Sequence, residues 1–467
     1  MSTLDSTTIA SSDLVEELMA ASRSDECVVI VTETGQANLR WAHNALTTNG
    51  QMHDRSLSVV AIRRSDDGAH CGTVSGRITS GGDALALLRS AERAAEAAPA
   101  AEDTMDLVDA CQDADFSSAA EGTSIEVLSR VAADLGEVFS QAESADLSTF
   151  GFVEHICTTT WLGTSNGIRR RHVQPTGRLE LNAKDRAMKR SVWLGRATRD
   201  FSDVDVSALW PELVTRYGWT ERQIELPAGR YETLLPPSAV ADLMIPAHWG
   251  AGWRDASEGR NAYSLPGGRT RIGERLGTLP YRLFSDPDHP GLEASPFVVS
   301  ASSSEGISSV FDNGADLDPT DWIRDGVVNE LLASRSVGQV SGRGAHPEID
   351  NLILDTGATT TLDEMVAATD RGLLLTCLWY IREVDPETLL LTGLTRDGVH
   401  LVEGGEVVGS VNNFRFNESP LDLLRRATEA SRTEIVLPRE WNDWFTRTAM
   451  PTLRIPDFNM STVSRAS

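Results

Sequence analysis

Residues 372–416 read GLLLTCLWYIREVDPETLLLTGLTRDGVHLVEGGEVVGSVNNFRF, and this segment carries the clearest structural signal in the chain. Runs of leucine and β-branched residues alternate with turn sequences at Asp385-Pro386, Arg396-Asp397-Gly398 and Gly404-Gly405. Short apolar runs, bounded by such turn residues at close and regular spacing, are typical of antiparallel strands. The segment therefore predicts an antiparallel meander within a β-rich domain.

A helix is expected on each side of these strands. On the N-terminal side, Thr361 and Glu364 have the spacing of a capping box, in which each side chain binds the other's backbone N–H. On the C-terminal side, Ser419 can serve as the N-cap, Pro420 as the first helical residue and Asp422 as a capping-box acid. The second half of the chain thus predicts strands accompanied by short helices.

The first half of the chain mixes helical and strand patterns. Residues 27–35 and 57–64 are rich in β-branched residues and are expected to be strands, with a turn at Asn49-Gly50 between them. Residues 150–181 show a similar strand pattern. Helices are expected from propensity or from a spacing of 3.6 residues over 84–98, 125–142 and 206–217.

The chain is long enough to divide into domains. Its 467 residues exceed what a single compact core usually holds. We expect an α+β fold, with an N-terminal α/β domain of antiparallel strands and helices over 1–222 and a C-terminal β-rich domain over 223–467. Residues 99–122 are acidic and rich in alanine and serine, so they read as a linker or loose loop that could subdivide the N-terminal domain.

The composition excludes some classes of partner. Forty-two basic residues against 68 acidic ones give a net charge of −26, so nucleic acid and anionic membranes would be repelled. Lys184 and Lys189 are the only lysines, which we interpret as a compositional bias rather than a site. No stretch approaches the about 20 apolar residues that cross a bilayer.

The cysteines and the N-terminal sequence favour the cytoplasm. The five cysteines are scattered and form no CxxC pair, which argues against a disulfide framework and a zinc ribbon. The initial sequence, MSTLDSTTIASSDLVEEL, lacks the basic start and apolar run of a signal peptide. We therefore expect a cytoplasmic protein.

Several segments resemble one known family. Leu378–Gly398 followed by Val411–Pro420 resembles the C-terminal domain of the TldD/TldE (PmbA) proteins, and Met450–Ile455 is similar to the family's terminal strand. Residues 37–50, ANLRWAHNALTTNG, resemble the N-terminal domain more weakly. The resemblance implies a heterodimer in which a TldD subunit carries the zinc and pairs with a TldE subunit. The two would enclose a chamber that admits unfolded or modified peptides.

The zinc motif of this family has no counterpart in the sequence. TldD subunits carry a helical HExxxH motif and a distant cysteine; the histidines bind the metal and the glutamate acts as base toward metal-bound water. None of the nine histidines here precedes a glutamate. The segment that the resemblance assigns to the zinc helix, residues 237–253, contains only His248, and residues 435–451, where the cysteine would fall, contain none. The chain thus resembles the metal-free TldE subunit, with no catalytic or metal-binding residue expected in it and zinc expected in an HExxxH-bearing partner.

Some side chains are candidates for facing the chamber or the partner. Asn413, Arg415 and Asn417 alternate with Phe414 and Phe416, as on a strand with one polar and one aromatic face. Such a strand could equally be an ordinary half-exposed strand of the sheet. The candidates expected to face the chamber or the partner are His248, Arg382, Asn413, Arg415 and Asn417.

Other interpretations stay open at this point. His248 could be a metal ligand completed from elsewhere, although a lone histidine is more often a structural residue. Cys377 could be a nucleophile with His400, although a cysteine on an apolar strand is usually a small buried hydrophobe. The chain could also be a peptidase by itself or as a homodimer, through an unrecognised site. A third alternative is a chaperone-like peptide-binding protein without proteolysis.

Overall fold

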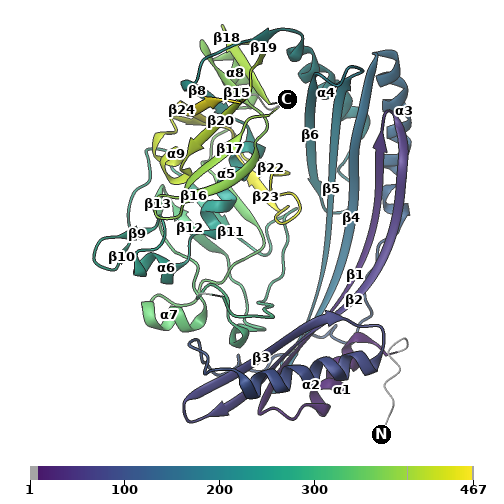
Figure 1. The fold of residues 1–467 in the computed structure, drawn as a ribbon, viewed down its shortest axis with the longest axis vertical. Coiled ribbons are helices and arrows are strands. Elements are labelled where there is room, and N and C mark those ends of the chain that lie inside the picture. Colours follow the sequence, from purple (N-terminus) through teal and green to yellow (C-terminus); the bar gives the residue numbers. More distant parts are fainter. Residues whose placement is uncertain (1–8, 305, 397, 465–467) are drawn as a thin grey trace.

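The computed structural model describes residues 9–304, 306–396 and 398–464, and in these ranges the fold is α+β (Figure 1). The predicted turn at Arg396-Asp397-Gly398 includes Asp397, which lies outside the described residues, as does the start of the N-terminal segment, residues 1–8. Three large sheets carry the architecture, and a short strand pair stands beside them. Within the described ranges, no helix is both long and apolar enough to cross a membrane.

The first half of the chain builds a long, curved antiparallel sheet, which runs along one side of the molecule (Figure 1). Its strand order is β3-β2-β1-β4-β5-β6, and every neighbouring pair is antiparallel. The strands are β1 (Glu26–Ala42), β2 (Ala45–Ser65), β3 (Gly68–Arg77), β4 (Leu147–Thr164), β5 (Arg169–Asp185) and β6 (Ser191–Thr198).

Helices cover this sheet in two groups, and all three predicted helices are present. The helices are α1 (Ser11–Ala21), α2 (Gly81–Ala97), η1 (Ile125–Leu128), α3 (Ser129–Ser144), α4 (Val206–Gly218) and η2 (Trp219–Glu221). The first two pack on one end of the sheet and α3 with α4 on the other, which gives two separate apolar clusters.

Alternation along β1 decides what each face of the sheet contacts. Val29 and Val31 lie in the cluster formed with α1 and α2, whereas Val28 and Ile30 lie in a cluster that includes Phe311 from the second half of the chain. Successive side chains of a strand point to opposite faces. One face of β1 therefore packs against α1 and α2, and the other face packs against the C-terminal half of the chain.

The β1–β2 hairpin turns earlier than the sequence predicts. The chain reverses at His43 and Asn44, which have φ values of 50° and 60°, and Asn49-Gly50 lies inside β2. Gly50 is paired there with Asn38 of β1. Asparagine tolerates the left-handed region that a tight hairpin turn needs. The long register between the strands, rather than the local Asn-Gly signal, therefore sets the turn.

Helix α2 packs very closely on β3. A Cβ atom placed on Gly72 would lie 2.1 Å from the carbonyl oxygen of Ala91 and 2.2 Å from the backbone nitrogen of Ala95. Only a glycine lets two backbones approach to this distance. By contrast, a Cβ atom on Gly136, on the exposed side of α3, would meet nothing within 4 Å.

The segment 98–124 contains no helix or extended strand, in agreement with the sequence, but it packs against the protein. Leu107 is buried in the cluster that contains Phe311, and the carbonyl of Phe116 accepts a hydrogen bond of 3.0 Å from Trp161 Nε1. The predicted division of the chain at 222/223 and the possible subdivision here remain predictions.

The second half of the chain holds a ten-stranded and a six-stranded sheet. The ten-stranded sheet runs β16-β17-β20-β24-β8-β15-β18-β19-β7, with β21 paired to β24; the six-stranded one runs β13-β12-β11-β14-β23-β22. The strands of the first are β7 (Gln223–Ile224), β8 (Gly229–Leu235), β15 (Arg371–Leu375), β16 (Trp379–Asp385), β17 (Leu390–Leu394), β18 (Val399–Glu403), β19 (Glu406–Val411), β20 (Phe414–Glu418), β21 (Glu429–Ala430) and β24 (Leu453–Val463). The other strands are β9 (Ser264–Leu265), β10 (Arg269–Thr270), β11 (Arg282–Ser285), β12 (Thr320–Arg324), β13 (Val327–Val328), β14 (Leu352–Asp355), β22 (Glu434–Val436) and β23 (Thr448–Met450).

The strands predicted from residues 372–416 are all present, in an order that local sequence does not reveal. Hairpins β16–β17 and β18–β19 form as neighbours in the chain. Between these two hairpins, however, lie β20, β24, β8 and β15, and β8 and β15 are parallel to each other. Distant strands therefore complete the sheet, because a parallel pair needs a long connection rather than a tight turn.

Short helices accompany these sheets, and their caps test the sequence signals. They are α5 (Pro237–Trp249), α6 (Trp253–Glu258), η3 (Val310–Asp312), α7 (Arg335–Ser341), α8 (Leu362–Ala367) and α9 (Pro420–Arg426). The capping box of Thr361 and Glu364 is confirmed. Ser419 is the N-cap of α9 and Pro420 its first residue, but the capping box with Asp422 is wrong. The Asp422 carboxylate instead accepts a hydrogen bond of 2.6 Å from Arg425, and Ser419 Oγ donates to the carbonyl of Thr388.

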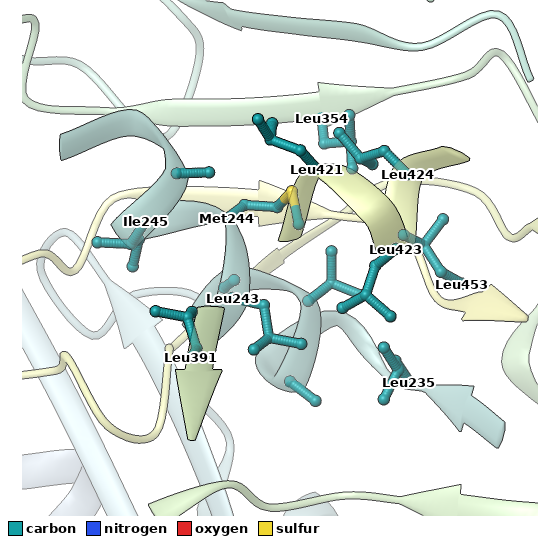
Figure 2. Close-up of a cluster of buried hydrophobic side chains, with 14 of the residues drawn as sticks. Leu235, Leu243, Met244, Ile245, Leu354, Leu391, Leu421, Leu423, Leu424 and Leu453 are labelled. Atoms are coloured by element: carbon teal, nitrogen blue, oxygen red, sulfur yellow. The ribbon is translucent and has the colours of Figure 1, made fainter. Parts of the chain in front are cut away.

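Helix α5 lies at the centre of the C-terminal half. Its side chains Leu243, Met244 and Ile245 are buried with leucines of α9, β8 and β24 (Figure 2). A helix that is apolar on all sides belongs in a core. The last turn of α5 lies beside the segment that precedes β23.

Candidate functional site

Helix α5 and the segment 438–445 lie far apart in the sequence but meet in the fold. The family resemblance assigns both segments to zinc ligands. Asp242 of α5 is fully buried, and its Oδ1 accepts a hydrogen bond of 2.9 Å from the backbone N–H of Glu440. The carbonyl of Asp242 accepts another of 2.9 Å from Trp441 Nε1. Burial holds the pKa of the Asp242 carboxyl well above its usual range, so the uncharged form is favoured. The structure thus joins the two segments through hydrogen bonds around one buried residue.

His248 lies in the last turn of α5 and is only 1% exposed. Its ring centroid lies 5.0 Å from that of Trp322 and 6.4 Å from that of Phe445. Neither ring nitrogen has a hydrogen-bond partner among the described residues. Burial lowers the pKa of His248 from 6.5 to about 4, so the ring is neutral near pH 7. His248 therefore lies inside the isolated chain, among aromatic rings.

The surroundings of His248 do not fit a zinc ion. One helical turn earlier stand Met244 and Ile245, which offer no ligand atom suited to zinc. The segment that approaches from residues 438–445 contributes Trp441, whose ring lies 5.3 Å from that of Trp249, and Phe445. In the ranges that the structure describes, no group of three or more His, Cys, Asp and Glu side chains is placed to hold a metal ion.

Two hollows of about 300 Å³ each open beside this junction. One is lined by aromatic rings and three carboxylates, among them Trp249, Phe297, Trp444, Glu348 and Asp350. The other lies between β5 and the C-terminal half and is lined by residues that include His172, Gln174, Arg199, Glu293 and Arg447. Hollows that combine apolar faces with a few polar groups are suited to noncovalent binding of a ligand.

The aromatic hollow contains residues that the sequence analysis missed. Trp444 is 79% exposed, a high value for a tryptophan, and Asp350 forms an ion pair with Arg447. The available signal was the sequence WNDWF, residues 441–445, in a chain with only 6% aromatic residues. Aromatic residues are enriched in protein interfaces relative to the rest of the protein surface.

The polar and aromatic alternation predicted for residues 413–417 is present. Phe414 and Phe416 of β20 are fully buried, whereas Arg415 is exposed and Asn417 is half-buried. Arg415 Nη1 donates a hydrogen bond of 3.2 Å to Thr392 Oγ1 on the neighbouring strand β17. Asn413 stands just before β20 and lines a third, polar hollow.

The five candidate side chains do not form one cluster. Arg382 lies on the edge strand β16 and is 67% exposed, with Nη1 3.4 Å from Glu440 Oε1. Arg415 lies on the same sheet with β17 between them, and His248 is buried on α5. Whether any of these side chains faces a chamber or a partner stays a prediction.

Cys377 and His400 both belong to the interior. Each is 2% exposed. Cys377 packs with Trp193 and Leu437, and His400 Nδ1 shares a hydrogen bond of 3.0 Å with Ser410 Oγ. Burial, together with the charge of Arg216, lowers the pKa of His400 to about 3. His400 is therefore neutral near pH 7 and engaged with a serine, which suits a structural role.

Arg439 is one of the arginines that join the two halves of the chain close to this region. The guanidinium of Arg439 lies 3.7 Å from the ring centroid of Trp379 and 5.1 Å from that of Trp193 on β6. Its Nη1 is also 3.2 Å from a carboxylate oxygen of Glu180 on β5. Cation–π contacts and a partly buried ion pair thus connect the N-terminal sheet to the segment beside α5.

Comparison with known proteins gives the family and the fold. Residues 228–462 match the PmbA/TldA metallopeptidase C-terminal domain. None of the curated proteins matches the chain. Among solved structures, TldE from Thermococcus kodakarensis superimposes with a TM-score of 0.75 at 14% identity, covering 96% of this chain and 98% of that one.

Two other solved structures share the fold. A candidate modulator of DNA gyrase from Thermotoga maritima gives a TM-score of 0.72 at 16% identity and covers 96% of this chain and 99% of its own. A protein described in the same way from Bacteroides thetaiotaomicron gives 0.73 at 13%, with 97% and 98% covered. The family match over half of the chain and the shared fold over nearly all of it lead to one conclusion: the chain belongs to the PmbA/TldD metallopeptidase family.

Proposed function

We propose that this chain is the TldE-like, non-catalytic subunit of a two-subunit zinc peptidase that acts on unfolded or modified peptides. The observation that carries the proposal is the junction of α5 with residues 438–445. These are the segments assigned to the zinc ligands, and here they meet through Trp249, Trp441 and Phe445. The lone histidine beside them is buried, and its helix neighbours are apolar.

In this proposal an HExxxH-bearing, TldD-like partner supplies the zinc and the catalytic base. The present chain completes the enclosure and holds the peptide beside the partner's metal. The hollow lined by Trp249, Trp444 and Asp350 is a suitable surface for an extended peptide or for the partner. Aromatic faces contribute binding without requiring one side-chain sequence, which suits a subunit that receives unfolded chains.

The cysteines support a cytoplasmic location for this complex. All five are free. Burial raises the pKa of Cys27 to about 11 and that of Cys71 to about 12, so their thiols are poor nucleophiles near pH 7. Free, unreactive thiols are the ordinary state in a reducing compartment.

Co-expression with the HExxxH homologue of the same cell tests the proposal. We expect a heterodimer in size-exclusion chromatography and chelator-sensitive hydrolysis of an unfolded peptide by the pair. The present chain alone is expected to show neither hydrolysis nor stoichiometric zinc. Chelator-sensitive hydrolysis by the chain alone would refute the proposal and favour an independent peptidase. Tight peptide binding without any association with the partner would favour a chaperone-like protein.

A further inference from the structure

The third hollow has a charge opposite to that of the protein as a whole. It has a volume of about 520 Å³ and opens between the β5–β6 hairpin, the β18–β19 hairpin and the residues before β20. Four cationic side chains line it: Lys184, Lys189, Arg190 and Arg396. Among the residues that the structure describes, no aspartate or glutamate lines it, although the chain has 68 acidic residues and a net charge of −26. Both lysines of the chain are thus located at one hollow.

The lysines are available to a ligand. Neither Lys184 nor Lys189 forms an ion pair within the described residues, whereas most arginines of this chain are paired with carboxylates. The ammonium of Lys184 lies 5.6 Å from the ring centroid of Phe150, a contact that limits where it can point. Cations in a hollow whose described lining contains no carboxylate attract an anion from solvent.

The carboxylate closest in sequence to the lysines is already engaged. Asp185, between them in the hairpin, accepts hydrogen bonds of 2.7 and 3.0 Å from the backbone N–H groups of Lys189 and Arg190. Arg190 Nε lies 3.8 Å from Asp185 and its guanidinium lies over the ring of Tyr217. Asp185 therefore offsets the positive charge of Arg190 and fixes the backbone of the β5–β6 hairpin. The charges of the two lysines are left facing the hollow.

Neutral hydrogen-bonding groups complete the lining. Asn412 Oδ1 accepts a hydrogen bond of 2.7 Å from the backbone N–H of Leu226, which fixes the side-chain amide. Its Nδ2 is buried and has no hydrogen-bond partner within the described part of the chain. A buried donor without a partner is destabilising unless a ligand supplies the acceptor. Thr220, Ser410 and Asn413 add further polar groups around it.

We infer that this hollow binds a carboxylate of a peptide, either its C-terminal carboxylate or an acidic side chain. The inference rests on the proposed role in peptide binding and names one chemical group that this chain would recognise. A carboxylate accepts hydrogen bonds from ammonium, guanidinium and amide donors together, which are the groups present. Nucleic acid is a poor alternative because its many phosphates would meet the acidic surface around the hollow.

Binding of three labelled peptides of equal length to the full chain tests the inference by fluorescence polarisation. The first peptide has a free C-terminus and no acidic side chain, the second is amidated and neutral, and the third is amidated and contains two aspartates. We expect the first or the third, or both, to bind at least about tenfold more tightly than the second. The pattern identifies the source of the carboxylate. Equal binding of all three would overturn the inference.

Variants of the hairpin locate the site. The double variant Lys184→Gln/Lys189→Gln should lose the preference, and Lys184→Arg/Lys189→Arg should keep most of it, because the charge remains. Arg186→Gln is the matched control: Arg186 lies in the same hairpin, pairs with Glu143 and Asp146, and does not line the hollow. A preference that survives the double glutamine variant, or that Arg186→Gln abolishes equally, would refute the assignment. Binding of inorganic phosphate to the hollow, with no binding of either peptide carboxylate, would refute it as well.

The test is separable from that of the proposed function. With the HExxxH partner, the wild-type chain should support hydrolysis of the amidated neutral peptide, which offers no carboxylate to the hollow. If the pair hydrolyses that peptide but wild type shows no carboxylate preference, the hollow is wrongly assigned and the subunit role stands. If no pair forms, the subunit role fails regardless of the hollow.

Discussion

Replacing His248 by leucine should stabilise the protein, and more strongly at acidic pH. The imidazole is 1% exposed, with two ring nitrogens that lack partners among the described residues. Removing a buried polar group without a partner recovers about 1–3 kcal/mol, and repacking of a side chain of similar volume costs less than about 1.5 kcal/mol. At pH 7.5 we expect His248→Leu to raise the free energy of unfolding by about 1 kcal/mol.

The pH dependence follows from the lowered pKa of His248. This pKa is about 4 in the folded chain and 6.5 in a solvated histidine, so between these values the unfolded chain binds a proton that the folded chain does not. Wild type therefore loses stability as pH falls from about 7 toward 4, by up to about 3 kcal/mol at 1.36 kcal/mol per pH unit. At pH 5 this contribution is about 2 kcal/mol. At pH 5 the free energy of unfolding of His248→Leu should thus exceed that of wild type by about 3 kcal/mol.

Denaturant unfolding followed by tryptophan fluorescence, at pH 7.5 and at pH 5, measures both quantities. Other buried groups titrate in both proteins, so their contributions cancel in the difference. The same substitution at His53, whose side chain is 64% exposed, controls for the removal of an imidazole as such. A variant that is less stable than wild type at pH 7.5, or an advantage that does not grow at pH 5, would refute this view of His248. Loss of bound zinc in the variant would revive its role as a metal ligand.

Three further tests, two of them with a control substitution, show how the fold is held together, each by the free energy of unfolding. Gly72→Ala should lower the free energy of unfolding by about 3 kcal/mol, because the methyl group would collide with the backbone of α2. Gly136→Ala is the control and should raise it by about 0.5–1 kcal/mol through helix propensity. Similar effects at the two sites would contradict the close packing of α2 on β3. Arg439→Ala should lower the free energy of unfolding by about 2 kcal/mol and make the chain more sensitive to limited proteolysis. Arg382→Ala is the control: its ion pair with Glu440 is exposed and weak, so the free energy of unfolding should change by less than about 0.5 kcal/mol. Thr361→Ala removes the capping box of α8 and should cost about 1 kcal/mol, and no measurable change would mean that α8 does not need its cap.

Local sequence determined the elements that depend on neighbours in the chain. The capping box at Thr361, the helices of the first half and the alternation of Phe414 with Arg415 all follow from contacts within a few residues. The missing zinc motif was equally visible, because HExxxH is a local pattern. The prediction of a turn at Asn49-Gly50 was wrong, because the seventeen residue pairs between β1 and β2 stabilise their register more than one dipeptide favours a turn.

Only the tertiary structure decided what surrounds each candidate residue. Insertion of β8 and β24 between the predicted hairpins joins residues more than 100 positions apart, and no local pattern encodes that pairing. The same holds for the contact of His248 with Phe445 and for Lys184 near Asn412, since burial and charge at a point depend on every segment that reaches it. The sequence alone thus determined that no HExxxH motif occurs in this chain. The tertiary structure determined that aromatic packing joins the segments assigned to the zinc ligands, and that both lysines line one hollow.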